Sequence, residues 1–458
     1  MEKRDVGNLK ITFIGGGSRA WAWTFMTDLA LDKDAGGEIR LYDLDFDAAN
    51  QNKTIGNQLP GNWRYSVHRT LPEALSGADF VIISILPGTF AEMRSDVHSP
   101  ERLGIYQSVG DTTGPGGIIR ALRALPMFVE FAEAIRDYAP DAWVINYTNP
   151  MALCLRALYH IFPRIKAFGC CHEVFGTQEL LAAMVERKLG VKGVRRHEIE
   201  VNVLGVNHFT WFSTASYKGN NLMEMYREFS DEFYETGFSS DHSDLVNQIF
   251  ASLNRVKFDL FRRFGWIAAA GDRHLAEFMP SREYLKDPET VRHWGFYLTP
   301  VDWREEDLKR RLEKSMKLVS AETRMTMSSS GEEGVALIKA LSGAGRMISN
   351  VNLPNYGGQI ANLPRETIVE TNAAFSLDDV RPVFAGALSD RVYKLIKPHA
   401  DNQSIILNAA LNGDRNSLYE AFGQDPLISG AASDASIRAL ADDMIKNTMK
   451  YLPECWRR

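Results

Sequence analysis

A thiol, an imidazole and a carboxylate follow one another at Cys171, His172 and Glu173. An apolar, strand-like segment precedes them, so all three should lie at the carboxyl end of a strand, where enzymes with parallel sheets carry out chemistry. Thiolate and imidazole groups bind borderline divalent metals, and His208 in the segment 205–209 is a further candidate ligand. Because free cysteines and lone histidines are often ordinary core residues, these positions alone leave a metal site open.

A second candidate site is a glycine-rich turn after the expected strand 10–14. Glycines there let the backbone approach a pyrophosphate, and the N-terminus of the following helix can bind it. Asp43 ends the next expected strand, where a carboxylate accepts hydrogen bonds from an adenosine ribose and favours NAD over NADP. Ala20 replaces the third glycine of the usual pattern. The candidate dinucleotide contacts are Gly15, Gly16, Gly17, Ser18 and Arg19.

Two further segments have polar residues in unusual surroundings. Asp272, in the segment 271–274, could act as a general base if it is held near a reacting carbon, although a turn with a surface salt bridge is the plainer interpretation. The segment 111–117 is too rich in glycine for the interior of a helix or strand. It predicts either a loop near the cofactor or a simple start of a helix.

These candidates lie within an alternating pattern of strands and helices. That pattern predicts an α/β fold, a Rossmann-type doubly wound parallel sheet, for residues 1–195. From 198–203 the alternation of polar and apolar residues is typical of a half-exposed antiparallel strand, so we expect a mixed α+β domain over 196–458. The segment from residue 378 onward has a helical pattern. The expected parallel strands are 10–14, 38–42, 78–84 and 142–146.

Composition excludes several classes of protein. A net charge of −6 argues against a general binder of nucleic acid. No apolar run is long enough to cross a membrane, and the first residues lack the apolar core of a signal peptide. Four cysteines, two of them adjacent at Cys170 and Cys171, do not make a disulfide framework. We therefore expect a reduced, cytoplasmic protein.

Taken in order, these segments resemble glycoside hydrolase family 4, the NAD- and metal-dependent glycosidases with a lactate/malate dehydrogenase-like fold. The four residues 171–174 (Cys-His-Glu-Val) are similar to those of its α-galacturonidase subgroup. The resemblance spans the whole chain and rests on residues 15–18, Arg94, 111–114, 148–150, 171–174, 207–208, 352–357 and 362–364.

The resemblance implies roles for individual residues. Cys171 and His208 would bind a divalent metal, most simply Mn²⁺. Asn149 would contact the sugar and lie beside the cofactor, Arg94 would contact the sugar as well, and Asp111 would tune the catalytic base. All five positions match motifs of the family.

The resemblance also implies a mechanism of redox-assisted elimination. Hydride passes from C3 of the sugar to NAD⁺, which acidifies the proton on C2. Asp272 would remove that proton, and His172 would assist the aglycone as it leaves C1. Water then adds and NADH returns the hydride. The phospho-glycosidases of the family have an aspartate acid and a tyrosine base where this chain has His172 and Asp272.

The expected substrates are α-galacturonides, in particular oligogalacturonides derived from pectin. Their carboxylate requires a cation, and Arg94, Arg273 and Arg292 are candidates. Alternative substrates are α-glucosides and α-galactosides. Two other classes stay open, a malate-type NAD-dependent dehydrogenase without hydrolysis and a redox-sensing module that binds NAD without catalysis. The resemblance further implies a homodimer or homotetramer.

Overall fold

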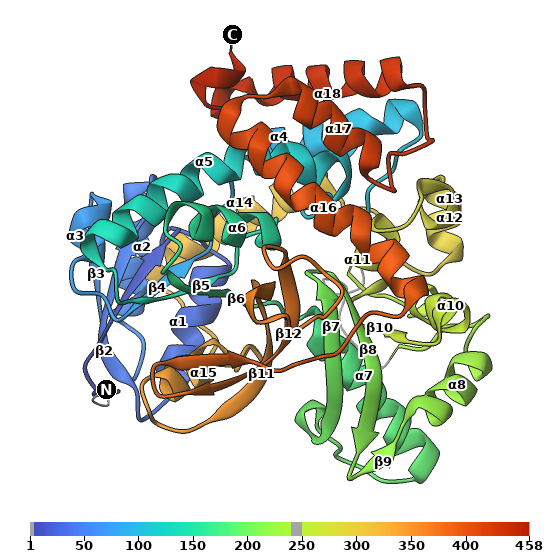
Figure 1. Cartoon of the computed structure of the whole chain (residues 1–458). Coiled ribbons are helices and arrows are strands. Elements are labelled where there is room, and N and C mark those ends of the chain that lie inside the picture. Colours follow the sequence, from blue (N-terminus) through green and yellow to red (C-terminus); the bar gives the residue numbers. More distant parts are fainter. Residues whose placement is uncertain (1–3, 240–249, 458) are drawn as a thin grey trace.

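The computed structural model describes residues 4–239 and 250–457. A nine-stranded sheet forms its centre, in the order β13-β12-β11-β6-β5-β4-β1-β2-β3 (Figure 1). Its strands from β1 to β6 all pair in parallel, which confirms the predicted Rossmann-type fold. They are β1 (Leu9–Ile14), β2 (Gly36–Tyr42), β3 (Asn62–Val67), β4 (Phe80–Ile83), β5 (Trp143–Asn146) and β6 (Lys166–Gly169).

Helices cover both faces of these parallel strands, which is why β4 is apolar and buried at every position. One face packs against α3 (Leu71–Leu75), α5 (Gly114–Tyr138) and α6 (Met151–Ile161). The other packs against α1 (Trp21–Leu31) and α15 (Gly334–Leu341). At one end of the sheet α2 (Phe46–Gly56) packs against β3, and α14 (Val301–Val319) packs against α2.

Three antiparallel strands from the C-terminal half extend the same sheet beyond β6. They are β11 (Met347–Pro354), β12 (Ile368–Ser376) and β13 (Asp379–Pro382). The predicted boundary near residue 195 therefore lies between two parts of the chain that share one sheet. The helical pattern expected from residue 378 begins only at Asp390, because Asp378 adopts a positive φ of 50° in a tight turn and β13 pairs back on β12.

The second sheet is built from residues after 195, as the alternating pattern predicted. It consists of β7 (Ile199–Val206), β8 (Phe209–Tyr217), β9 (Asn220–Asn221) and β10 (Ile267–Ala268). Around it lie α7 (Glu173–Leu189), α8 (Met223–Glu232), α10 (Arg255–Phe264), α11 (Asp272–Glu277), α12 (Ser281–Tyr284) and α13 (Pro288–His293).

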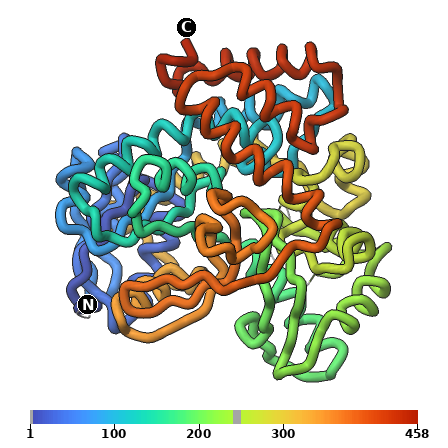
Figure 2. Tube along the Cα trace, in the orientation of Figure 1, coloured from blue at the N-terminus to red at the C-terminus, as the bar shows by residue number. Residues whose placement is uncertain are grey.

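The C-terminal helices lie across α5, at the top of the molecule in Figure 2. In the sequence they are far from the strands that they help to cover. They are α16 (Asp390–Asn412), α17 (Arg415–Gln424) and α18 (Asp434–Thr448), and α4 (Phe90–His98) packs beside α18. Their apolar side chains complete the same core as α5 and α6. No helix among residues 4–239 and 250–457 has the length and apolar character that crossing a membrane requires.

Candidate active site

Three ligand-type side chains converge where the two sheets meet. One ligand atom of each of Asp111, His208 and His274 lies within 4.8 Å of the others. Asp111 precedes α5, His208 lies in the two-residue turn between β7 and β8, and His274 lies on α11. The turn holds His208 at a positive φ of 65°, and its ring centroid lies 3.9 Å from that of His274. We call these three residues the trio.

Hydrogen bonds orient the trio so that lone pairs face one another. The Thr112 hydroxyl donates its single proton to Asp111 Oδ1 at 2.8 Å, so it accepts from His208 Nδ1 at 2.9 Å. His208 Nε2 is then left with its lone pair. His274 Nε2 lies 3.4 Å from the Glu173 carboxylate, and its buried Nδ1 has no hydrogen-bond partner among the described residues. Two imidazole nitrogens and one carboxylate are thus available to a cation, a set that suits a divalent transition metal.

Electrostatics support this interpretation of the trio. Burial and the neighbouring His274 lower the pKa of His208 to about 3, so its ring is neutral at pH 7. Burial raises the pKa of Asp111, but Arg120 and the two histidines lower it more, and the group stays ionised. Burial lowers the pKa of His274, but Glu173 raises it more, so the trio attracts positive charge when no metal is bound.

Helix α11 and the loop before α5 are held together by a buried carboxylate that sequence reasoning did not identify. Glu277 Oε1 accepts backbone N–H groups from Val109 at 2.7 Å and Gly110 at 2.9 Å. Glu277 lies on α11 one turn after His274, and Gly110 directly precedes Asp111. This contact therefore sets how close Asp111 and His274 approach. The only sequence signal was the helical spacing of the two residues on α11.

Cys171 lies next to the trio but is not one of its members. Its thiol is hydrogen-bonded to the side chain of Asn207, the residue before His208. Asn207 also donates to Glu370 at 3.3 Å, and Asn350 donates to Glu370 at 2.7 Å and to the Cys171 carbonyl at 3.3 Å. Burial, Glu370 and Glu173 hold the pKa of Cys171 well above its ordinary value. We call Cys171, Asn207, Asn350 and Glu370 the cysteine network.

Asp272 is placed differently from the general base that the sequence predicted. Its carboxylate is fully buried and accepts the backbone N–H groups of Val256 at 3.3 Å and Lys257 at 3.1 Å. These N–H groups belong to the first turn of α10 and lack partners within their own helix, so Asp272 satisfies part of the start of that helix. His274, two residues further on, reaches the trio instead. A role of Asp272 as base stays a prediction.

His172 lies at the N-terminus of α7 with 53% of its side chain exposed. Its Nδ1 atom is 3.1 Å from the Glu332 carboxylate. This contact, with Glu173 nearby, raises the pKa of His172 to about 9 against the effect of burial. The ring therefore carries a proton at neutral pH, as the predicted assistance to a leaving group requires.

The predicted sugar contacts lie in different places. Asn149 lies at the trio, where its amide nitrogen is 3.5 Å from Asp111 Oδ2 and its buried oxygen has no partner among the described residues. Arg94 is half-exposed on α4 and paired with Asp302 and Glu305 on α14. Its predicted contact with the sugar has no support from this arrangement.

The other two arginines also have structural surroundings of their own. Arg273 is buried and donates to the carbonyl of Ser108 and, at 3.1 Å, to that of Tyr297. Arg292 is exposed on α13. Neither guanidinium lines the cavity beside the trio that is described below.

The predicted dinucleotide turn has the required close packing. Gly15 has a positive φ of 93°, and a Cβ atom there would lie 1.9 Å from the carbonyl oxygen of Ser84. Gly17 donates its N–H to Asp43 Oδ2 at 2.8 Å, which places the acidic side chain directly beside the turn. Arg19 borders a cavity of about 680 Å³ between α1 and α14.

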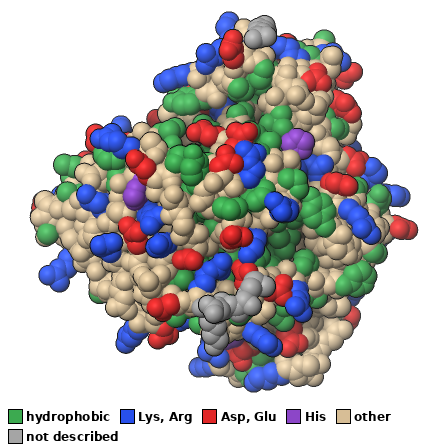
Figure 3. All heavy atoms as spheres, turned by 60° about the vertical axis from the view of Figure 1, so that its left-hand side comes forward, with side chains coloured by type: hydrophobic (Ala, Val, Ile, Leu, Met, Phe, Trp, Pro, Cys, Tyr) green, Lys and Arg blue, Asp and Glu red, His purple; other side chains and the backbone are tan. Residues whose placement is uncertain are grey.

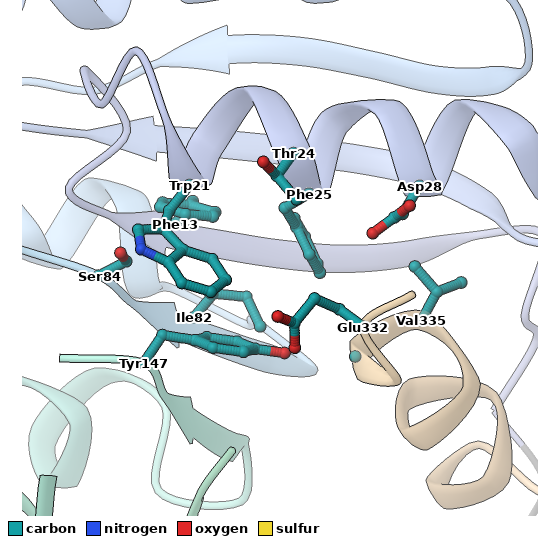
Figure 4. Close-up of a pocket in the computed structure, with 11 residues that line it drawn as sticks. Phe13, Trp21, Thr24, Phe25, Asp28, Ile82, Ser84, Tyr147, Glu332 and Val335 are labelled. Atoms are coloured by element: carbon teal, nitrogen blue, oxygen red, sulfur yellow. The ribbon is translucent and has the colours of Figure 1, made fainter. Parts of the chain in front are cut away.

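Aromatic rings lead from the turn toward His172, and two of them, Trp21 and Tyr147, are stacked (Figure 4). The rings of Trp21 and Tyr147 lie 5.5 Å apart, and Trp21 is 6.1 Å from the His172 ring. In the close-up the Glu332 carboxylate points toward the Tyr147 hydroxyl. The dinucleotide turn and His172 therefore border one continuous region at the carboxyl edge of the sheet.

Models of known families match most of the chain. The family 4 glycosyl hydrolase model matches residues 10–187, and the model of that family's C-terminal domain matches residues 203–428. This chain belongs to glycosyl hydrolase family 4. The resemblance predicted from the sequence is confirmed, and the family 4 chain is a glycosidase.

Relatives with the same overall length are known. An α-galacturonidase of Lachnoclostridium phytofermentans is 55% identical over 98% of this family 4 chain and 98% of its own length. One from Thermoanaerobacterium saccharolyticum is 56% identical over 98% and 97% of the two chains. A putative glucosidase of Bacillus subtilis has a solved structure with a TM-score of 0.91 at 51% identity, covering 95% of this chain and 99% of that one.

A more distant solved structure shares the fold. It is a 6-phospho-α-glucosidase from gut microorganisms in complex with NAD and Mn²⁺, with a TM-score of 0.78 at 19% identity over 97% of this chain and 99% of that one.

Proposed function

We propose that this family 4 chain hydrolyses α-galacturonides, with oligogalacturonides derived from pectin as natural substrates. The observation that carries the proposal is the convergence of two imidazoles and a carboxylate in a chain that also has a dinucleotide turn and is more than half identical to two α-galacturonidases. A glycosidase that works with two carboxylates on either side of the glycosidic bond needs neither a metal site nor a dinucleotide turn. NAD-dependent glycosidases are an exception to this two-carboxylate mechanism.

NAD fits the turn after β1. The turn packs so closely on the Ser84 carbonyl that position 15 has no room for a side chain, as in a tight pyrophosphate-binding turn, and Asp43 stands beside the turn as acceptor for a ribose hydroxyl. When bound, NAD supplies a reversible hydride acceptor. The chain itself provides the backbone N–H groups of the turn and of α1, as well as the aromatic surface of Trp21 and Tyr147.

A divalent metal, with Mn²⁺ as the proposed ion, fits the trio. His208 and His274 would supply nitrogen ligands and Asp111 an oxygen ligand, and the unpartnered His274 Nδ1 is the observation that tests this fit. We keep Cys171 as a proposed further ligand, since its neighbour Asn207 directly precedes His208. When bound, the metal supplies a Lewis acid that polarises sugar oxygens and stabilises negative charge on them.

The remaining groups bind and orient the substrate or hold protons. The unpartnered oxygen of Asn149 can accept a sugar hydroxyl beside Asp111. Glu173 fixes the orientation of the His274 ring. His172 holds a proton at the rim of the site, where we propose that it assists the departing aglycone.

Turnover on matched glycosides tests the proposal. Digalacturonate, p-nitrophenyl α-galactoside and p-nitrophenyl α-glucoside are compared at equal concentration with NAD⁺, Mn²⁺ and a thiol reductant. We expect release of galacturonate to be the fastest reaction, without accumulation of NADH. Faster cleavage of a neutral glycoside would contradict the substrate, and accumulation of NADH would indicate a dehydrogenase of the malate type.

We also propose that the chain forms a homodimer or homotetramer and acts in the cytoplasm. All four cysteines are free, as a reducing compartment allows. Charged side chains of both signs are interspersed on the face shown in Figure 3. Light scattering coupled to gel filtration measures the oligomeric state, and a monomer at micromolar concentration would contradict the assembly.

A further inference from the structure

A cavity of about 400 Å³ lies beside the trio, between the N-termini of α7 and α10 and the segment 330–332. The residues of its wall that matter here are His172, Glu173, Arg196, Lys257, Gly271 and Glu332. Glu173 links the cavity to the trio through its contact with His274. The volume is in the range of pockets that bind small molecules, and it is large enough for a monosaccharide unit.

Most charges in this wall already have partners. Arg196 pairs with Glu333 at 2.9 Å and stacks on a phenylalanine ring. The His172 ring pairs with Glu332. Glu173 accepts the N–H of Gly271 at 2.8 Å as well as contacting His274. Paired charges of this kind have little capacity left for a substrate carboxylate.

Among the cations of the wall, Lys257 is the exception. Only 2% of its surface is exposed, and its ammonium donates to one described acceptor, the Thr177 hydroxyl at 3.0 Å. No carboxylate of residues 4–239 and 250–457 forms an ion pair with it. Asp272 and Glu173 act on it electrostatically, but the Asp272 oxygens are occupied by N–H groups of α10, and Glu173 is bonded to Gly271 and His274.

A buried ammonium without an ion pair is costly, and buried charges are normally paired. An ammonium has three N–H donors, so Lys257 has donors to spare at the wall of the cavity. Burial lowers the pKa of Lys257 to about 8, which still leaves most of the side chain protonated at pH 7.

From this geometry we propose that Lys257 binds the carboxylate of a uronate sugar in the cavity and thereby determines specificity for galacturonides over neutral glycosides. The inference rests on the proposed function and names the cation that this function requires. None of Arg94, Arg273 and Arg292 lines this cavity, and Arg94 and Arg273 already have partners.

The test is the ratio of activities of wild type and Lys257→Met on a charged and a neutral substrate. On p-nitrophenyl α-galacturonide we expect KM to rise about 10- to 100-fold, the effect of losing a hydrogen bond between charged groups, with a smaller change in kcat. On p-nitrophenyl α-galactoside KM should stay the same or fall. An equal change on both substrates would overturn the role in specificity.

KM values for digalacturonate show which carboxylate Lys257 binds, that of the sugar that is cleaved or that of the departing sugar. A KM increase on both galacturonides supports contact with the sugar that is cleaved. An increase on digalacturonate alone supports contact with the departing sugar. No increase on either galacturonide overturns the proposal.

Two controls separate binding from a structural role. Lys257→Arg retains the positive charge and should restore part of the affinity, whereas Thr177→Val removes the present acceptor and should leave KM for galacturonide within about threefold. The thermal midpoint of Lys257→Met should be unchanged or higher, because a desolvated charge has been removed. A contradictory result would be a lower thermal midpoint for Lys257→Met together with equal losses of galacturonide affinity in Lys257→Met and Thr177→Val. It would show that Lys257 only ties α10 to α7.

Calorimetric binding of D-galacturonate, with D-galactose as the neutral control, needs no turnover. Wild type should bind galacturonate more tightly than galactose, and Lys257→Met should lose that preference. If wild type binds galacturonate through Lys257 yet hydrolyses no galacturonide, the proposed function fails while the carboxylate site is supported. If wild type hydrolyses galacturonides and the variant keeps its preference, only the Lys257 proposal fails.

Discussion

The trio and the cysteine network lie on two sides of one short turn, yet their hydrogen bonding differs. His208 faces the trio, where two imidazole nitrogens and a carboxylate converge and His274 Nδ1 has no partner among the described residues. Asn207, one residue earlier, faces the network, where Cys171 and Glu370 are bonded to amides. In the network the Asn207 oxygen also lacks a partner among the described residues, but the groups around it are bonded to one another. A buried ring nitrogen without a partner, beside other ligand-type groups, is expected where an ion completes it, whereas a bonded network holds a geometry. The trio is therefore the side prepared for an ion, and the network fixes the turn that presents it.

The largest expected effect is that of His208→Ala, since His208 lies between the two sides. We expect the affinity for Mn²⁺ to fall by more than about 100-fold, beyond the loss that an outer-shell partner causes. Paramagnetic resonance of free Mn²⁺ measures the affinity without turnover. His160→Ala, on the exposed surface of α6, is the matched control and should bind Mn²⁺ as wild type does. If His208→Ala retains its affinity for Mn²⁺, the metal does not bind at this turn.

Cys171→Ser compares the two sides directly. We expect a loss of Mn²⁺ affinity of about 10- to 100-fold, smaller than that of His208→Ala because the trio is still present. His274→Ala, measured in parallel, should lose at least as much as Cys171→Ser. A larger loss of Mn²⁺ affinity in Cys171→Ser than in His274→Ala would show that the principal metal ligands lie on the side of Cys171.

Glu277 tests whether the trio depends on its scaffold. Glu277→Leu removes the acceptor of the Val109 and Gly110 N–H groups and should weaken Mn²⁺ binding about tenfold. Glu277→Gln keeps a carbonyl acceptor and should restore most of that affinity. Equal losses in both variants would mean that the charge of Glu277, rather than its hold on the loop, matters.

The cysteine network should show its effect mainly in stability. Burial raises the pKa of Glu370 to about 7 from an ordinary 4.5, so the folded protein holds this proton more tightly than the unfolded chain. Wild-type stability therefore falls as pH rises from 4.5 to 7 and is level above that, whereas Glu370→Gln lacks this loss. Relative to wild type, the variant should gain about 3 kcal/mol between pH 4.5 and pH 8.

Glutamine fits this position because its amide can donate to the Asn207 oxygen, which now has no partner among the described residues. Urea unfolding at the two pH values measures the difference. A variant that is less stable than wild type at pH 8 would show that the ionised carboxylate, and not its protonated form, holds the network.

The parts of the site that are contiguous in sequence could be predicted. The glycine turn and Asp43 are recognisable because one strand, one turn and one helix make nearly the whole site. In the structure the Asp43 carboxylate accepts the N–H of Gly17. His208 was identified because the contiguous motif at residues 207–208 matches the family.

The assembled parts could not be predicted in the same way. Asp272 and His274 lie two residues apart on α11, and only the docking of α10 decides that the carboxylate binds Val256 and Lys257 while the imidazole reaches Asp111. Lys257 has no motif at all, since its role depends on burial and on the absence of a partner within the described part of the chain.

An anomalous-scattering map of crystals grown with Mn²⁺ locates the metal without turnover. We expect one strong peak within ligand distance of His208 Nε2, His274 Nδ1 and the Asp111 carboxylate. A manganese ion bound elsewhere, with His274 and Asp111 outside ligand distance, would contradict the proposed metal site.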